Sequence, residues 1–187
     1  MNKIKLTISA LLVVLSAGVA MAQASVSLGL KGGLNFASVN TTSPGAAYSS
    51  RTGYHVGAFA NFKFTKLAIQ PEIIYSVQGA DAAAGNIETG YINIPIILKF
   101  YLIGGLNLQA GPQFGFLSSA TSGGVDIKST LESSDISVGL GAGFDISKFV
   151  IDARYNLGIS DVDKATTEAK NQVFQLSVGF KFFKLGN

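Results

Sequence analysis

The feature that most constrains this chain is a strict alternation of apolar with other side chains, which recurs eight times after residue 25. A period of two places successive side chains on opposite faces of a β-strand, and no segment of useful length has the 3.6-residue period of a helix. In every stretch one face carries no charge, no amide and no hydroxyl except that of tyrosine. The fold class that follows is all-β, with expected strands at 26–36, 54–64, 67–77, 92–102, 106–116, 136–146, 149–159 and 174–182.

The second face of the same strands is polar and rich in glycine. A soluble lipocalin-like barrel would also alternate, with its apolar face inside and its charges outside. Charged residues make up only 13% of this chain, about half of the fraction usual in a soluble globular chain. Glycine suits a crowded, curved interior. We therefore expect the apolar face to meet lipid. The polar face then lines a lumen with a network of eight charges: Lys31, Lys63, Glu72, Lys99, Asp145, Asp152, Arg154 and Lys181.

The lengths of the strands and connections favour a transmembrane barrel. Strands of about 11 residues suffice to cross a bilayer at a tilt, and only a closed barrel satisfies every backbone group there. Tight turns are expected at 65–66, 103–105 and 147–148, and longer connections at 37–52, 79–90, 117–135 and 160–172. Outer-membrane barrels have short periplasmic turns and longer outer loops. The sequence thus predicts an eight-stranded antiparallel up-and-down barrel with periplasmic termini and four outer loops.

The first 22 residues have the pattern of a signal peptide. Lys3 and Lys5 precede an apolar stretch from Leu6 to Val19, and Ala20-Met21-Ala22 supplies an A-x-A cleavage site. The alternative is an uncut membrane anchor. We expect removal of 1–22, a single barrel domain at 23–187 and location in the cell outer membrane.

The charge and cysteine counts exclude several partners and cofactors. Cleavage would leave twelve basic against eleven acidic residues, so no basic patch for nucleic acid is expected. The chain has no cysteine, which excludes a lipoprotein anchor and any thiolate site. A single histidine excludes sites that need two, and no cofactor or metal is expected.

Four segments resemble the PorT-like outer-membrane β-barrel proteins of Bacteroidetes. They begin at Leu30, Gln70, Tyr91 and Gly111 and read LKGGLNF, QPEIIYSVQG, YINIPIILKF and GPQFGFL. The resemblance covers nearly the whole expected mature chain, in order. The resemblance implies an eight-stranded outer-membrane barrel but does not imply a shared reaction. A few relatives are linked to protein secretion across that membrane, and most have no assigned role. This chain departs from the family in lacking a basic residue before Gly79 and in continuing past its final aromatic residue.

His55 is the one candidate for catalysis. It lies near the outer end of the strand expected at 54–64, on the polar face. With Ser38, Ser49 or Ser50 it could form a His–Ser pair, as in barrel enzymes that modify lipid A. Such enzymes need catalytic groups that face lipid, so we favour a rim histidine hydrogen-bonded to a loop and expect no catalytic residue.

Two further groups of charged residues have either a functional or a purely structural interpretation. The lumen charges could line an ion path, but eight strands leave an interior that side chains just fill, which favours a plug of salt bridges. Asp161, Asp163 and Glu168 could bind calcium, but their spacing matches no complete calcium loop. We interpret them as a solvated loop.

The function predicted from the sequence is a non-enzymatic integral outer-membrane protein. It would be a scaffold that presents surface loops or takes part in secretion, assembly or adhesion. The alternatives are a barrel enzyme acting on outer-membrane lipid and a narrow channel. Expected partners are membrane lipid and other outer-membrane or surface proteins, contacted through 37–52, 79–90, 117–135 and 160–172.

Two local expectations concern strand pairing. Proline cannot donate to a ladder, so Pro71, Pro95 and Pro112 should cause breaks or bulges on three consecutive strands. Symmetric pairing across 79–90 would place Glu72 opposite Ile97. We then expect Glu72 to contact Lys99 or Arg154, and Asp145 or Asp152 to pair with Arg154, Lys31 or Lys181.

Overall fold

The computed structural model describes residues 24–40, 49–82, 85–130, 133–159 and 170–186. The expected signal peptide at 1–22 and the acidic residues Asp161, Asp163 and Glu168 lie outside these ranges. The described elements are β1 (Ala24–Asn40), β2 (Ser49–Phe64), β3 (Leu67–Ala82), β4 (Gly85–Tyr101), β5 (Leu106–Ser122), β6 (Val125–Asp126), the 3₁₀ turn η2 (Lys128–Thr130), β7 (Ser134–Ile146), β8 (Phe149–Gly158) and β9 (Lys170–Leu185).

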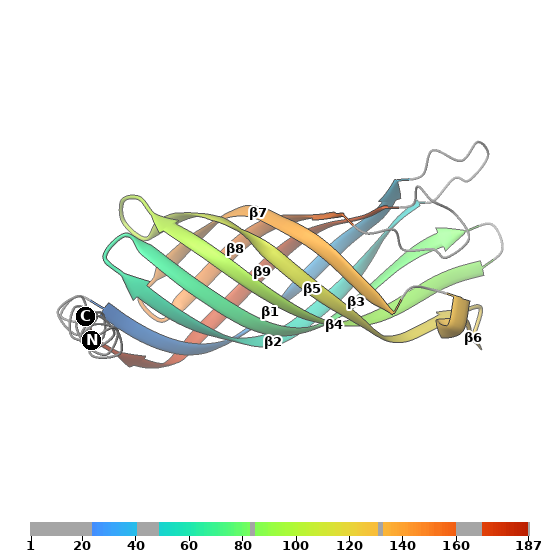
Figure 1. The fold of residues 1–187 in the computed structure, drawn as a ribbon, viewed down its shortest axis with the longest axis horizontal. Coiled ribbons are helices and arrows are strands. Elements are labelled where there is room, and N and C mark those ends of the chain that lie inside the picture. Colours follow the sequence, from blue (N-terminus) through green and yellow to red (C-terminus); the bar gives the residue numbers. More distant parts are fainter. Residues whose placement is uncertain (1–23, 41–48, 83–84, 131–132, 160–169, 187) are drawn as a thin grey trace, which may run out of the picture.

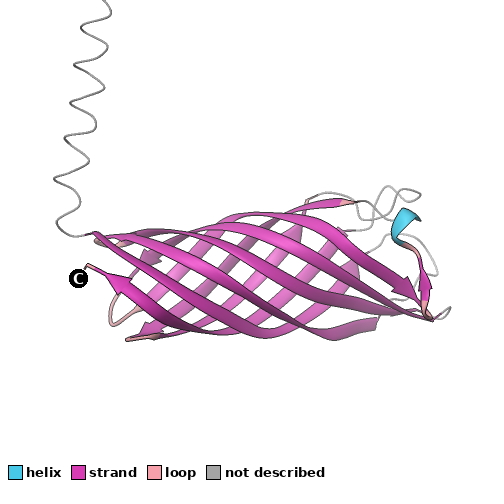
Figure 2. Cartoon of the chain, turned by 90° about the horizontal axis from the view of Figure 1, so that it is seen from below, coloured by secondary structure: helices cyan, strands magenta, loops and turns pink. Residues whose placement is uncertain are grey.

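Eight of these strands form a closed antiparallel barrel (Figures 1 and 2). Each wall strand pairs with the next along the chain, and β1 closes the wall by pairing with both β2 and β9. Leu30, for example, lies opposite Ala58 on one side and Phe180 on the other. β6 pairs only with the end of β5. The predicted all-β, eight-stranded up-and-down barrel is confirmed.

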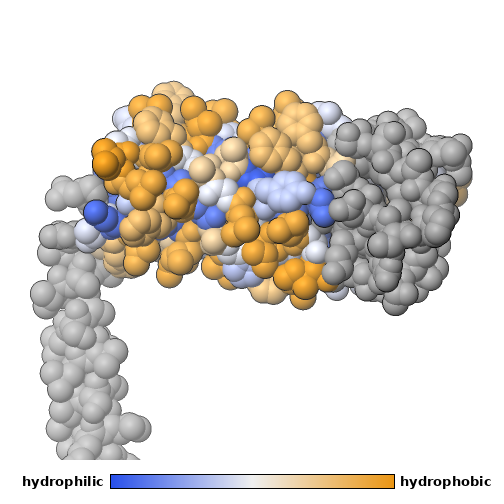
Figure 3. All heavy atoms as spheres, turned by 90° about the horizontal axis from the view of Figure 1, so that it is seen from above, coloured by the Kyte–Doolittle hydropathy of each residue, from blue (hydrophilic) through white to orange (hydrophobic). Residues whose placement is uncertain are grey.

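The alternation of the sequence becomes the two faces of the wall. On β4 the apolar side chains at even positions 92–100 are 38–50% exposed, whereas Asn93, Ile97 and Lys99 on the other face are at most 2% exposed. Figure 3 shows apolar residues over much of the outer surface of one side. The outer wall is therefore the apolar surface, and the polar face is the lumen. Among the described residues, no helix is long and apolar enough to cross a membrane.

The two ends of the barrel differ. The end at which β1 begins and β9 ends, here called the turn end, has the tight turns at 65–66, 102–105 and 147–148 (Figure 1). Thr65 and Ser147 adopt positive φ angles of 54° and 53°, as Gly104 does at 64°, which tight hairpin turns require. The opposite end, here called the loop end, joins the longer connections. The alternation of tight turns and longer connections agrees with the sequence, whereas the periplasmic position of the turn end stays a prediction.

Six of the eight wall strands are longer than the sequence predicted, by five to seven residues, whereas β7 is longer by two and β8 is shorter by one. The expected loop at 79–90 is wrong: Gly79 pairs with Glu88 and Ala82 with Gly85, so that only residues 83 and 84 separate β3 from β4. The loops expected at 37–52 and 117–135 likewise begin and end in strand, and residues 170–172 of the loop expected at 160–172 belong to β9. The apolar period stops where the apolar surface stops, although the backbone ladder continues beyond it.

The three prolines interrupt the ladders as expected, and in a consistent direction. Pairing is absent between β2 and β3 beside Pro71, between β3 and β4 beside Pro95, and between β4 and β5 beside Pro112. Each proline stays paired with the strand that follows it. Neighbouring prolines also lie at similar heights, since Pro71 is opposite Ile96 and Pro95 is opposite Gln113. The register is the same on both sides of each gap, so these are breaks and not bulges.

One large apolar side chain reaches the lumen because glycines make room for it. The Phe59 side chain is buried on the lumen face of β2, and a Cβ on Gly29 would collide with its ring. A Cβ on Gly179 would lie 3.2 Å from the same ring. The glycine-rich polar face is thus a packing requirement of the barrel interior.

Candidate functional site

A cluster of five charged side chains, here called the central cluster, crosses the middle of the lumen. Its members are at most 4% exposed and come from four strands, β1, β3, β4 and β8: Lys31, Glu72, Lys99, Asp152 and Arg154. Lys31 Nζ lies 3.3 Å from Glu72 Oε1 and 3.1 Å from Asp152 Oδ2. Arg154 donates from Nη2 to Glu72 Oε1 at 2.9 Å and from Nη1 to Oε2 at 3.2 Å. This bidentate ion pair fixes the guanidinium and carboxylate planes relative to each other.

Two amides complete the central cluster. Gln70 donates to Glu72 Oε1 at 2.8 Å, and Gln109 donates to Asp152 while accepting from Arg154 Nη2 at 3.0 Å. Lys99 Nζ lies 3.5 Å from Asp152 Oδ1. Buried charges stabilise a fold only when geometry and extra hydrogen bonds offset desolvation, and here each carboxylate has several donors. The arrangement cross-links the wall from inside.

A second layer lies toward the turn end and is centred on Asp145. Its carboxylate lies 2.6 Å from Lys181 Nζ and 3.7 Å from Lys99 Nζ. It also accepts from the Tyr101 hydroxyl at 3.0 Å and from Asn107 Nδ2 at 3.2 Å. Lys63 forms no ion pair among the described residues, and its Nζ lies 4.0 Å from the centroid of the Tyr101 ring. The Asp145 carboxylate is therefore already contacted by four other groups and does not form an ion pair with Lys63.

A third layer lies toward the loop end and contains His55. Its Nδ1 is 2.8 Å from Asn35 Oδ1 and its Nε2 is 2.9 Å from Ser177 Oγ. Asn35 also donates to Ser76 Oγ at 2.8 Å, and Gln175 donates to Asn35 Oδ1. The expectation of a histidine bonded to a loop is therefore wrong, since both partners belong to wall strands β1 and β9. The register of the barrel brings them together.

The structure places the eight sequence-predicted lumen residues on the inner side of the wall and joins seven of them in ion pairs. The exception is Lys63, which stacks on Tyr101. The predicted position of Glu72 is wrong: Gln70 lies opposite Ile97, and Lys99 lies opposite Ala68. The connection is centred one residue earlier than assumed, which moves the register by two. The expected contact of Glu72 with Arg154 is nevertheless confirmed, and Lys31 is a second partner.

Sequence reasoning missed the uncharged members of these layers. Asn35, Gln70, Tyr101, Gln109 and Ser177 all have the parity of the lumen face. Their parity indicates that they face the lumen, but it does not predict which residues contact each other across the barrel. Among the described residues, no three His, Cys, Asp or Glu side chains are grouped as metal ligands would be.

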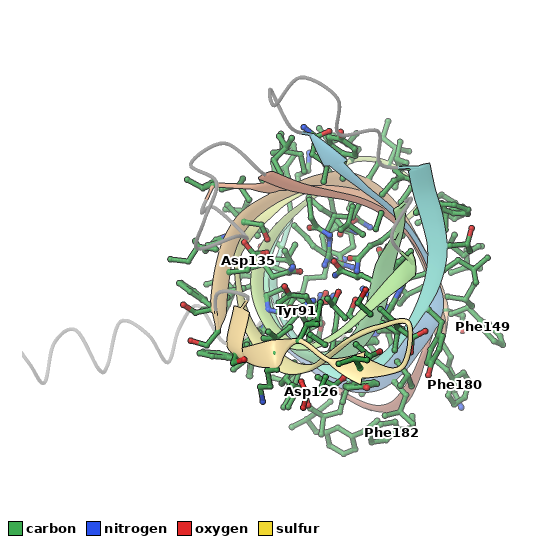
Figure 4. The ribbon with its side chains drawn as sticks, turned by 90° about the vertical axis from the view of Figure 1, so that its right-hand side faces the viewer. Tyr91, Asp126, Asp135, Phe149, Phe180 and Phe182 are labelled. Carbon is green, nitrogen blue, oxygen red and sulfur yellow. The ribbon has the colours of Figure 1, made fainter. Side chains whose placement is uncertain are left out.

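The loop end is partly covered by the connection between β5 and β7. Ile127 packs against a small buried cluster of Tyr91, Leu117 and Ala120, and its amide donates to the Ala120 carbonyl at 3.0 Å. Figure 4 looks along the barrel from this end and shows side chains filling the interior, whereas Phe149, Phe180 and Phe182 point away from the wall. Side chains from the wall strands thus project into the lumen, and the central cluster occupies its middle.

Comparisons with solved structures identify barrels of the same fold. The chain superposes on Neisserial surface protein A (NspA) with a TM-score of 0.62 and 17% identity, covering 84% of this chain and 99% of that one. It superposes on Ail, the attachment invasion locus protein of Yersinia pestis, with a TM-score of 0.53 and 18% identity, covering 86% and 99%. For OprG of Pseudomonas aeruginosa the TM-score is 0.51 at 11% identity, covering 89% and 98%. At these identities the likeness shows the fold alone.

Sequence comparison gives the family. Comparison with curated proteins yields no match. The family model described as "Outer membrane protein beta-barrel domain" matches residues 21–164, well over half of the chain. Together with the closed barrel, its apolar outer wall and its polar lumen, this match shows an integral outer-membrane barrel, and the chain belongs to the outer membrane protein β-barrel domain family.

Proposed function

We propose that this protein is a non-enzymatic scaffold of the outer membrane, in the PorT-like group of Bacteroidetes. Its plugged barrel would hold the loop-end strands and connections rigidly for contact with other outer-membrane or surface proteins. The process served is adhesion, secretion or assembly. Cleavage of residues 1–22 during export is part of the proposal.

The observation that supports this proposal most is the buried central cluster. An ion path needs mobile water and groups that release an ion, whereas Glu72 and Arg154 are held by paired hydrogen bonds at 2.9 and 3.2 Å. Phe59 and Ile97 add apolar bulk to the same interior. The interior therefore favours a rigid body over a channel.

Planar-bilayer recordings test the scaffold against the channel. Purified protein should give no resolved conductance steps, under conditions where a large porin gives clear ones. The Glu72→Ala/Asp152→Ala double variant removes two carboxylates from the plug and should leak more than the native protein. Regular steps from the native protein would contradict the proposal.

One arrangement favours a second candidate, a serine hydrolase. Ser177, His55 and Asn35 are linked at 2.9 and 2.8 Å in the order nucleophile, base and orienting group. All three side chains are at most 5% exposed and face the filled lumen, away from lipid. A substrate carbonyl has no described space beside Ser177, so we regard these bonds as structural.

An activity-based probe separates the two candidates. A fluorophosphonate reagent should leave Ser177 unmodified in membranes, and His55→Ala cells should contain the same lipid A species as native cells. Labelling that is lost in both Ser177→Ala and His55→Ala would establish the hydrolase instead.

The partner is best sought at the loop end. Cross-linking in intact cells, followed by purification from native outer membrane, should recover a defined outer-membrane or surface protein. Replacing residues 123–133 with a Gly-Ser segment should weaken that recovery, whereas changes in the 65–66 turn should not. Recovery of lipid alone would count against a protein scaffold.

A further inference from the structure

A cavity of about 210 Å³ opens at the turn end of the lumen, on the other side of the central cluster from the loop end. We call it the turn-end pocket. Its polar lining includes Ser25, Ser27, Lys63, Asp145, Lys181 and Lys184. It is smaller than the roughly 300–1,000 Å³ of pockets for drug-sized ligands, so it suits a small group.

The charge of the pocket is strongly positive. Three lysines and one aspartate give the lining a formal charge of +2. The Asp145 carboxylate already receives Lys181, Lys99, Tyr101 and Asn107, as described above. Lys63 and Lys184 therefore have no carboxylate partner among the described residues. A mouth lined in this way attracts anions and concentrates them.

Lys184 lines the pocket because the last strand is irregular. Lys181 lies opposite Gly29 and Phe183 opposite Leu28, so one extra residue, Phe182, is inserted in β9. Phe182 and Phe183 are both exposed on the outer wall, at 58% and 46%. The bulge resets the alternation and sets Lys184 opposite Ser27, which is on the lumen face. Simple alternation from Lys181 would have turned Lys184 toward lipid.

Hydroxyl donors lie beside the ammonium groups. Ser25 and Ser27 are 7% and 6% exposed on β1. In the described part of the chain, neither hydroxyl makes a side-chain hydrogen bond. Three ammonium groups and two hydroxyls from the neighbouring strands β1, β2 and β9 match an anion with several acceptor oxygens better than a two-oxygen carboxylate.

We infer that the turn-end pocket binds a phosphate group, held chiefly by Lys63 and Lys184 with the Ser25 and Ser27 hydroxyls. The same chemistry is supplied by free phosphate in the periplasm and by phospholipid head groups. Exposed Phe64, Phe149 and Phe180 ring the wall at this end, as aromatic girdles do at head-group depth. The site lies at the opposite end from the loop-end surface proposed above and does not depend on it.

The test is calorimetric titration of the full barrel in non-ionic detergent at low salt. One arm uses inorganic phosphate and the other uses dihexanoyl phosphatidylglycerol, with sodium acetate for comparison. The Lys63→Gln/Lys184→Gln variant should bind the phosphate compound at least tenfold more weakly. The matched control is Lys66→Gln/Lys148→Gln, which makes the same charge change in exposed turns at the same end, outside the pocket lining. It should bind like the native protein.

The outcomes separate cleanly. Binding of inorganic phosphate with this pattern supports the site and a soluble ligand, and binding of the lipid alone with this pattern supports the site and a head-group ligand. No binding in either arm, acetate binding as tight as phosphate binding, or equal weakening in both double variants would overturn the inference. Heat-modifiable gel mobility checks folding, and Lys184→Gln alone serves if the double variant does not fold. Because Lys184 is solvent-exposed, that change leaves the buried layers intact.

Discussion

Arg154 is the residue on which the interior depends most. It is fully buried, and its two terminal nitrogens donate hydrogen bonds to the Glu72 carboxylate, which also forms an ion pair with Lys31. Removing one partner from a buried ion pair leaves the other charge without compensation, and this costs more than the pair itself contributes. The cluster is therefore sensitive to any single truncation.

We accordingly expect Glu72→Ala to lower the free energy of unfolding by about 3–5 kcal/mol, because Arg154 and Lys31 lose their shared carboxylate. The control is Asp126→Ala at the loop end, where the carboxylate caps the amide of Lys128 at 2.8 Å in an exposed turn. That change should cost at most about 1 kcal/mol. Urea unfolding in lipid vesicles measures both. Equal losses would show that the cluster does not stabilise the barrel.

At this scale the sequence predicts which residues face inward but not which ones meet. Parity placed Glu72, Arg154 and His55 on the lumen face. Their partners depend on the register of several ladders at once, and an error of one residue in the centre of the β3–β4 connection moved Glu72 away from Lys99. Neutral side chains such as Gln109 and Ser177 carry no charge signal, so nothing singled them out.

Cysteine labelling on a single strand can test which of its faces points outward and which points into the lumen. The chain has no native cysteine, so one introduced cysteine is a clean probe of either face. Ile96→Cys should react with a lipophilic maleimide in membranes, because Ile96 is 43% exposed on the outer wall. Asn93→Cys on the same strand should stay unreactive until the barrel unfolds, because Asn93 is 2% exposed in the lumen. The reverse pattern would mean that the faces are inverted.

The irregularity of β9 gives a sharper expectation for an element. Deleting Phe183 removes the extra residue but keeps Lys184 at lumen parity, opposite Ser27. The shortened strand should therefore fold and retain phosphate binding within about threefold of native. Deleting Lys184 instead places Leu185 at that position and should abolish binding. Calorimetry on the two deletions checks this, and loss of binding in the first would show that the bulge itself shapes the site.

The sequence predicts that these strands exist, in which order they follow, and which residues point outward or into the lumen. It does so because lipid and lumen require opposite side-chain chemistry at alternate residues. It does not predict where the strands end. The apolar series of the outer face ends at Val77 on β3 and begins at Ile92 on β4, whereas both strands continue past these residues. The breaks beside Pro71, Pro95 and Pro112 could be foreseen, because a missing N–H acts locally.

For the whole molecule, orientation is the property to establish. Protease added to intact cells should cut between β1 and β2, or between β5 and β7, before it cuts the 65–66 turn. The reason is that short turns of such barrels face the periplasm. Immunoblotting of the fragments with and without outer-membrane permeabilisation measures the order. Cleavage confined to the short turns in intact cells would reverse the assignment of the two ends.

The length of β3 and β4 has a consequence for any encounter with a partner at the loop end. Five residues of β3 follow Val77, and at about 3.3 Å per residue and a tilt near 45° they rise roughly 12 Å above the last apolar residue of the outer face. Fixing a free backbone costs about 1–2 kcal/mol per residue in conformational entropy. Here ladder hydrogen bonds fix that backbone when the barrel folds. A protein docking on this rim meets a preorganised surface, and its affinity is not reduced by the ordering of a flexible loop.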